Sequence, residues 1–392
     1  MKKLIPLSIP SFEGNESKYV NDALEQGWVS TGGSYITRLE EQIADFVKVE
    51  KVAACQSGTA ALHLSLVEAG VSAGDVIIVP PLTFIAAVNP IKYQFATPVF
   101  IDCDDSLCMD PEKLKSFCEE ECSFNNGILT FKNSPVKAII VVHVFGNLAD
   151  MVRIMNIAET YNLIVIEDAT EALGSRYTSG KYNGKFAGTI GDFGAFSFNG
   201  NKIITTGGGG AVLACRPEKV EHMKYLSTQA KDDLHFYLHN EVGYNYRMTN
   251  LQAALGVAQM EKLPEFINRK QRNYELYYEL FSDFEFGHIV KFREDTDSNK
   301  WLYSLEINRE KVHVTMREII TALETYGIQT RAVWGLINEQ LPYLNEFTYR
   351  LEKAPYYAAR ILNIPCSTQI TSDEIKYVVS AIKNVLGEFA NE

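Results

Sequence analysis

The sequence predicts an α/β protein with two unequal domains. Over roughly the first 230 residues, short apolar runs alternate with amphipathic helical segments, an order typical of strands joined by helices. From about residue 250 onward, the pattern changes to long helices with few strands between them. We therefore expect an N-terminal segment and large domain over residues 1–249, followed by a smaller α+β domain over residues 250–392.

Several apolar runs are expected to be buried strands of a mainly parallel sheet. They cover residues 76–79, 98–101, 138–142 and 163–166. A helical segment is expected over residues 59–69, and Gly70 can end it in the left-handed conformation. Asp110 followed by Pro111 predicts the start of another helix.

The polar residues 121–134 are expected to form a surface insertion. Beyond residue 250, the pattern predicts consecutive long helices, then a strand, then further helices. These elements cover residues 251–263, 264–281, 301–307, 315–326 and 372–389, in that order.

Composition and charge argue against several classes of protein. Apolar residues make up 46% and charged residues 22%, as in ordinary soluble globular proteins. The net charge of −12 argues against nucleic acid or an acidic membrane as a partner, since both favour a basic surface. No apolar stretch is long enough for a membrane span, and the first residues lack the apolar core of a signal peptide. The 7 cysteines show no zinc-binding spacing, so we expect free thiols, no metal site and a cytoplasmic location.

The most informative stretch surrounds Lys202, which lies between an apolar run and the glycines at 207–210. A lysine with few solvated neighbours holds its proton less tightly, and the neutral amine can attack an aldehyde. Glycines let the backbone approach a planar ligand closely. These features suit a bond between Lys202 and the aldehyde of pyridoxal phosphate. In isolation, a surface lysine beside a flexible turn would explain the stretch equally well.

Another segment could hold the phosphate of that cofactor. Ser57, Gly58 and Thr59 follow an apolar run and open a helix, where free N–H groups, hydroxyls and the helix dipole favour an anion. Ser197 could add a further hydroxyl donor. The alternative is that Ser57 or Thr59 simply caps the helix.

Two further side chains could serve the pyridine ring. Asp168 follows the run at 163–166, and the carboxyl ends of parallel strands are where open sheets bind ligands. Its carboxylate could hold the ring nitrogen protonated, although helix caps and structural ion pairs are common there. Phe84 also follows an expected strand and could stack on the ring, although an isolated phenylalanine is more often part of a core. The aromatic and polar residues 243–248 could serve the site or form an ordinary loop.

In this order, the motifs resemble those of the DegT/DnrJ/StrS sugar aminotransferases, which have the aspartate-aminotransferase fold (pyridoxal-phosphate fold type I). The resemblance runs through nearly the whole chain. It is strongest at residues 27–32, 57–62, 83–89, 167–169, 197–210 and 243–256. Ordered motifs at family-like separations are far more specific than any one of them alone.

The resemblance implies roles for individual residues. Lys202 matches the lysine that bonds to the cofactor, Asp168 the acid on the pyridine nitrogen, and Glu171 the residue beside the phenolic oxygen. Phe84 matches the aromatic side chain that stacks on the ring. The residues that match the phosphate cradle are Ser57, Gly58, Thr59 and Ser197.

The resemblance also implies a homodimer with shared active sites, because Asn245 matches a phosphate ligand donated by the neighbouring subunit. The implied substrates are a nucleotide-linked sugar and L-glutamate. Substrate contacts are implied for Trp28, Ser30, Arg247 and Arg331.

Within the family, the sequence is most similar to enzymes that aminate C4 of a nucleotide-linked 4-keto-6-deoxy-N-acetylhexosamine for legionaminic-acid and bacillosamine-type glycans. Residues 197–202, 227–230 and 298–301 carry this similarity, and Asn199 stands where many members have histidine. The sequence departs from the family pattern after Arg331. There Ala332, Leu336 and Asn338 take the places of two prolines and a histidine, which leaves the exact substrate open.

Three other functions fit parts of the pattern. A dehydratase of the same fold would carry histidine in place of Lys202. A nicotinamide-dependent dehydrogenase would place its glycines between a strand and a helix, whereas the glycines at 207–210 precede an expected strand at 211–214. A non-catalytic regulator would be expected to lack Lys202 or Asp168. The presence of both residues favours the aminotransferase.

Overall fold

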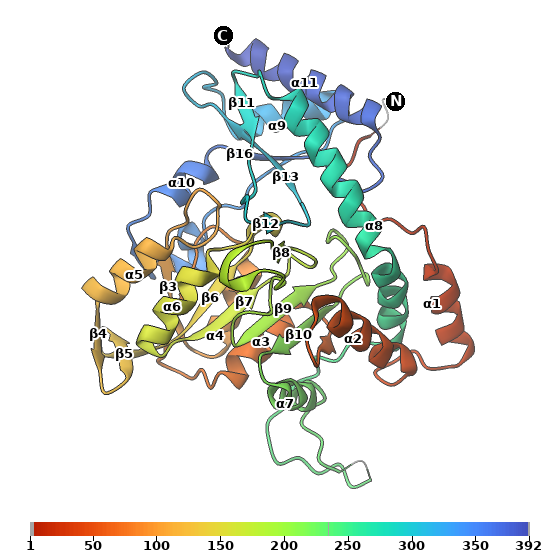
Figure 1. Cartoon of the computed structure of the whole chain (residues 1–392), viewed down its shortest axis with the longest axis vertical. Coiled ribbons are helices and arrows are strands. Elements are labelled where there is room, and N and C mark those ends of the chain that lie inside the picture. The colour runs from red at the N-terminus through yellow and green to blue at the C-terminus, as the bar shows by residue number, and fades with distance from the viewer. Residues whose placement is uncertain (1–3, 234, 391–392) are drawn as a thin grey trace.

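The computed structural model describes residues 4–233 and 235–390, and a ten-stranded sheet is its largest element (Figure 1). Residues 1–3 lie outside the described residues. They begin the N-terminal stretch that, by its sequence, lacks the apolar core of a signal peptide. The main path of the sheet runs β1-β10-β9-β7-β6-β2-β3-β15, with β4 and β5 attached through β6. From β9 to β15 all neighbours are parallel, so the expected mainly parallel sheet is confirmed. The strands are β1 (Ala53–Cys55), β2 (Val76–Val79), β3 (Thr97–Ile101), β4 (Cys122–Asn125), β5 (Ile128–Phe131), β6 (Ser134–Val142), β7 (Ile164–Asp168), β9 (Phe193–Ser197), β10 (Gly210–Ala214) and β15 (Phe347–Tyr349).

Helices cover this sheet, which explains why its central strands are apolar throughout. All four residues of β2 are buried, and their branched side chains suit an extended backbone. Among the helices, α3 packs on β9 and β10, α6 on β7, and α5 on β3. The helices are α1 (Glu16–Glu25), α2 (Ser34–Val47), α3 (Gly58–Glu68), α4 (Asn89–Tyr93), α5 (Pro111–Glu120), α6 (Met151–Tyr161), α7 (Pro217–Ser227), α8 (Asn250–Leu280), α9 (Met316–Thr325), α10 (Lys353–Ala358) and α11 (Ser372–Ala390).

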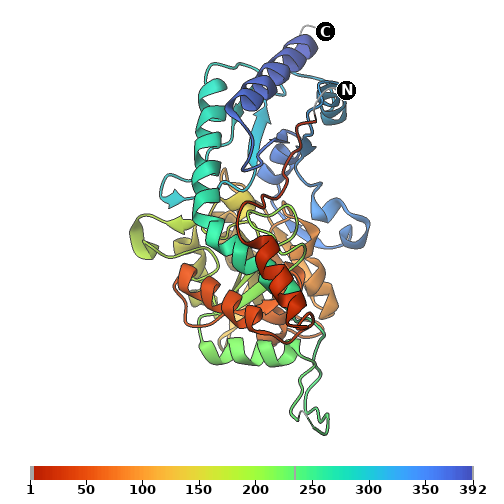
Figure 2. The ribbon, with the colours of Figure 1, turned by 90° about the vertical axis from the view of Figure 1, so that its right-hand side faces the viewer.

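A second, antiparallel sheet lies above the first in Figure 1 and has the strand order β11-β13-β16-β14. Helices α8, α9 and α11 pack around it, and α8 extends from α1 and α2 up to α11 (Figure 2). A two-stranded ribbon pairs β12 with β8. The remaining strands are β8 (Arg176–Tyr177), β11 (Gly287–Ile289), β12 (Thr296–Asp297), β13 (Tyr303–Ile307), β14 (Arg331–Ala332) and β16 (Ile361–Ile364).

The C-terminal part of the chain also contributes to the large sheet. Helix α8 begins at Asn250, the first residue of the expected smaller domain, but β15 returns to pair with β3. The division into residues 1–249 and 250–392 therefore stays a prediction.

One sequence-based expectation is wrong. The residues on either side of Pro264 were expected to form separate helices, yet α8 runs through this proline as one helix of 31 residues. Proline costs a helix interior about 3 kcal/mol because it removes one backbone hydrogen bond. The burial of Leu263 and Phe266, together with packing against α1 and α2, outweighs that cost.

The segment between α7 and α8 projects from the body of the molecule in both Figure 1 and Figure 2. It carries exposed apolar side chains, among them Phe236, Tyr237, Leu238 and Val242. Within the described residues, no helix combines the length and apolar character needed to cross a membrane. All 7 cysteines are free thiols, as expected.

Candidate active site

A cavity of about 420 Å³ lies at the carboxyl ends of β7 and β9, beside the start of α3. This is the edge where parallel sheets bind their ligands, as the sequence predicted. Most of the predicted site residues line this one cavity, although they come from widely separated parts of the chain. They are Ser57, Gly58, Thr59, Phe84, Asp168, Glu171, Ser197, Lys202 and Arg331.

The start of α3 forms one wall of the cavity. The Ser57 hydroxyl accepts a hydrogen bond from the Ala60 N–H at 3.1 Å, so the simpler interpretation as a helix cap also holds. The N–H groups of Gly58 and Thr59 have no partner within the helix, because they belong to its first turn. A Cβ atom at Gly58 would lie 2.8 Å from the Thr170 side chain and 3.0 Å from Ser197. Glycine therefore fits here without displacing these neighbours, and its N–H, free because it lies in the first turn of α3, is available to a phosphate.

Asp168 ends β7 and is buried, with a carboxylate that accepts the Thr170 N–H at 3.1 Å. Burial raises the pKa of this carboxyl, while Lys202 opposes the rise. A buried carboxylate is stable only when donors or a cation satisfy it. The protonated ring nitrogen of pyridoxal phosphate is such a partner, so Asp168 fits the role predicted for it.

Lys202 is not a surface lysine, since only 12% of its side chain is exposed. Its Nζ lies 3.6 Å from Glu171 Oε1 and 4.1 Å from the centre of the Trp301 ring. Glu171 is buried, and its other oxygen accepts the Phe145 N–H at 2.8 Å. Burial raises the pKa of Glu171 to about 7, although the nearby Lys202 lowers it.

The sequence-based reasoning missed several residues that shape the cavity. Trp301 and Trp334 line it, as do Thr170 and Asn201. Trp301 lay within a stretch noted only for its resemblance to the family, and nothing local marked it as a neighbour of Lys202. The contact depends on how the two sheets meet, which no sequence pattern encodes.

Four predicted residues lie outside the cavity of a single chain. Asn245 is exposed and forms a backbone bridge with Thr228. The other three are Trp28, Ser30 and Arg247. Trp28 is exposed, and the Ser30 carbonyl accepts the Asn250 N–H at 2.6 Å. Their roles at the site stay predictions.

A largely enclosed lysine, a buried aspartate and an anion-binding helix start around one cavity suit a pyridoxal-phosphate enzyme of the aspartate-aminotransferase fold. Comparison with known families agrees, since residues 10–383 match the DegT/DnrJ/EryC1/StrS aminotransferase family. The chain belongs to this family. It is a pyridoxal-phosphate-dependent aminotransferase of nucleotide-linked sugars.

Individual relatives support this assignment. GDP-perosamine synthase of Caulobacter vibrioides is 35% identical over 97% of this chain and 98% of its own length. The UDP-4-amino-4,6-dideoxy-N-acetyl-beta-L-altrosamine transaminase of Campylobacter jejuni is 29% identical over 91% of both chains. Among solved structures, the pyridoxal-phosphate form of the putative sugar aminotransferase Spr1654 from Streptococcus pneumoniae superposes with a TM-score of 0.87 at 25% identity, covering 98% and 99% of the two chains.

Glu171→Gln is expected to change how the stability of the cofactor-free protein depends on pH. The folded state raises the pKa of Glu171 from 4.5 to about 7, so it binds this proton more tightly than the unfolded state does. As pH rises through that window, the parent protein should lose up to about 3 kcal/mol of stability from this group.

The glutamine variant cannot ionise and should escape this loss. Urea unfolding at about pH 5 and about pH 8 measures the free energy of both proteins. Relative to the parent, the free energy of unfolding of Glu171→Gln should be higher at about pH 8 than at about pH 5. An equal difference between the two proteins at both pH values would contradict the assignment of this pKa.

Proposed function

We propose that the protein transfers the amino group of L-glutamate to C4 of a nucleotide-linked 4-keto-6-deoxy-N-acetylhexosamine, giving a 4-amino-4,6-dideoxy sugar for bacterial surface glycans such as those built from legionaminic acid or bacillosamine. The observation that carries the reaction type is the convergence of Lys202, Asp168 and Glu171 on one cavity beside the start of α3. The sugar class rests on the sequence resemblance at residues 197–202, which includes Asn199 in the cavity wall.

In this proposal, pyridoxal phosphate supplies an electron sink for amino-group transfer when it is bound. Ser57, Gly58, Thr59 and Ser197 would hold its phosphate, and Phe84 would cover its ring. Asp168 would hold a proton on the ring nitrogen. Lys202 Nζ would anchor the cofactor and, once free, move a proton to and from the substrate carbon that exchanges its amino group.

Glu171 and Arg331 complete the proposed assignment. Glu171 lies close enough to Lys202 to help hold the proton on the lysine nitrogen between proton transfers. Arg331 lines the cavity and is exposed, so its guanidinium could bind an anionic group of the substrate. A dehydratase of the same fold is the alternative. It is disfavoured because a lysine, not a histidine, occupies the position beside Glu171.

A second candidate substrate is worth a direct test, because the relatives named GDP-perosamine synthase are 34–35% identical to this chain. Their name favours a GDP-linked sugar. We expect both classes of sugar to enter a cavity of this kind. The protein should therefore discriminate between an N-acetyl group and a hydroxyl at C2 of the sugar through its contacts with that substituent.

Incubating the protein with glutamate and a panel of 4-keto-6-deoxy sugar nucleotides tests the proposed substrate class. For a given nucleotide, the N-acetylated sugar should show a kcat/KM at least about 10-fold above that of the sugar with a C2 hydroxyl, a difference of about 1.4 kcal/mol. Lys202→Ala is the matched control and should form no 4-amino sugar. A preference for the C2 hydroxyl would overturn the proposed substrate, and turnover by Lys202→Ala would overturn the mechanism.

We further propose that the active form is a homodimer in which Asn245 completes the neighbouring chain's site. The loop that carries Asn245 is held beside the start of α3, because the Gln56 N–H donates to the Tyr246 carbonyl at 2.8 Å. Exposed apolar side chains on the projecting segment before it, such as Phe236 and Val242, favour burial against another chain.

Mixing two inactive variants tests this shared site. Lys202→Ala and Asn245→Asp should each lose activity, the second because its new charge repels the phosphate. In a mixed dimer, one site would combine the intact Lys202 of one chain with the intact Asn245 of the other. Activity should therefore return.

Mixing Lys202→Ala with Asp168→Asn is the matched control. Both residues line the cavity of the same chain, so no mixed dimer contains an intact site and no activity should return. Subunit exchange is verified with differently tagged chains. Exchange without recovery in the Asn245 mixture would contradict the shared site.

A further inference from the structure

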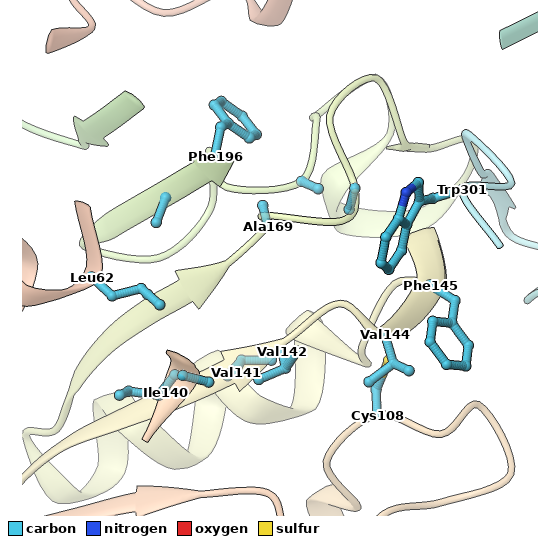
Figure 3. Close-up of a cluster of buried hydrophobic side chains, with 14 of the residues drawn as sticks. Leu62, Cys108, Ile140, Val141, Val142, Val144, Phe145, Ala169, Phe196 and Trp301 are labelled. Atoms are coloured by element: carbon cyan, nitrogen blue, oxygen red, sulfur yellow. The ribbon is translucent and has the colours of Figure 1, made fainter. Parts of the chain in front are cut away.

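Trp301 forms a wall of the cavity directly over the amine of Lys202. The Lys202 Nζ lies 4.1 Å from the centre of the indole ring. Trp301 is only 3% exposed, and it lies beside Phe145 within the buried cluster shown in Figure 3. The ring therefore shields one side of the amine from water.

Several bonds fix the position of this tryptophan. Its indole N–H donates to the Asn201 carbonyl at 2.8 Å, and its backbone N–H donates to Asn299 Oδ1 at 3.0 Å. Its carbonyl accepts a hydrogen bond from the buried Lys270 Nζ at 2.7 Å. Trp301 precedes β13 of the small sheet, whereas Asn201 and Lys202 follow β9 of the large sheet. The indole thus links the segment that leads into β13 to the loop that carries the lysine.

The charged groups that share the cavity with Lys202 are Asp168, Glu171 and Arg331. Glu171 faces the amine at 3.6 Å, and Trp301 faces it through the negative π-face of its ring. Lys300, the neighbour of Trp301 in the chain, turns toward the Phe292 ring at 3.9 Å. The aromatic face and the carboxylate both favour positive charge at the Lys202 nitrogen.

We propose that Trp301 is a positioning residue that holds the Lys202 nitrogen at the cavity wall and stabilises its positive charge. This inference rests on the proposed role of Lys202 as the residue that bonds to the cofactor. The aromatic face contacts the free amine in the structure, and it would act on the same nitrogen when the cofactor is bonded to it. A tryptophan that served only as packing would leave the proton affinity of this nitrogen unchanged.

The test is a pH titration of the cofactor-loaded protein without substrate, followed by visible absorbance. When protonated, the nitrogen that would join Lys202 to the cofactor would give a visible absorption band, and this band would be lost as rising pH removes that proton. Trp301→Leu removes the aromatic face and should lower the midpoint by about one pH unit, a 10-fold weaker hold on the proton. Trp301→Phe keeps an aromatic face, so its midpoint should stay close to that of the parent protein.

Trp334→Leu is the matched control, because Trp334 lines the same cavity but packs on Phe145 with 4.8 Å between ring centres. Its midpoint should stay at the parent value. Near-ultraviolet circular dichroism checks that each variant is folded. An unshifted midpoint in folded Trp301→Leu, or an equal shift in Trp334→Leu, would overturn the inference. A parent protein without any visible band would instead overturn the proposed role of Lys202.

Discussion

Two adjacent carboxylates at the end of β7 organise this molecule. Successive side chains of a strand point to opposite faces, so Glu167 and Asp168 serve different partners. Glu167 accepts backbone N–H groups of Gly188, Ile190 and Gly191 and pairs with His143 at 2.8 Å. These hydrogen bonds satisfy the buried carboxylate of Glu167 entirely with groups of the protein. It fixes the end of β7 and thereby leaves Asp168 aimed at the cavity, where a cofactor can satisfy the second charge.

The small sheet contributes to the same site through a chain of buried contacts. Asn299 donates to the carbonyls of Glu171 and Leu173, both at 3.0 Å, and so holds the segment that carries Glu171. A Cβ atom at Gly146 would lie 2.0 Å from Asn299 Oδ1, so the backbone must pass very close to this amide. Because Asn299 and Trp301, in the segment that leads into β13, contact Glu171 and Lys202 respectively, movement between the sheets would disturb the amine directly.

The sequence predicted much of this structure where the determining pattern is local. The apolar run of β2, the cap at Ser57 and the glycine that ends α3 each depend on a few neighbouring residues. The break at Pro264 was predicted wrongly because tertiary packing outweighs a local cost. The contact between Asn201 and Trp301 joins residues 100 apart, and no periodicity foretells it. A role for Asn245 stays a prediction because it depends on a second chain.

The central claim is that Lys202, and no other lysine, bonds to pyridoxal phosphate. Lys300 is the strongest competitor, since burial lowers its pKa to about 8 and so makes its amine easier to deprotonate than that of an ordinary lysine. Yet only Lys202 of these two lines the cavity. Reducing the loaded protein with borohydride, digesting it and mapping the modified peptide by mass spectrometry decides between them. The account predicts the cofactor on the peptide containing Lys202, and attachment at Lys300 would contradict it.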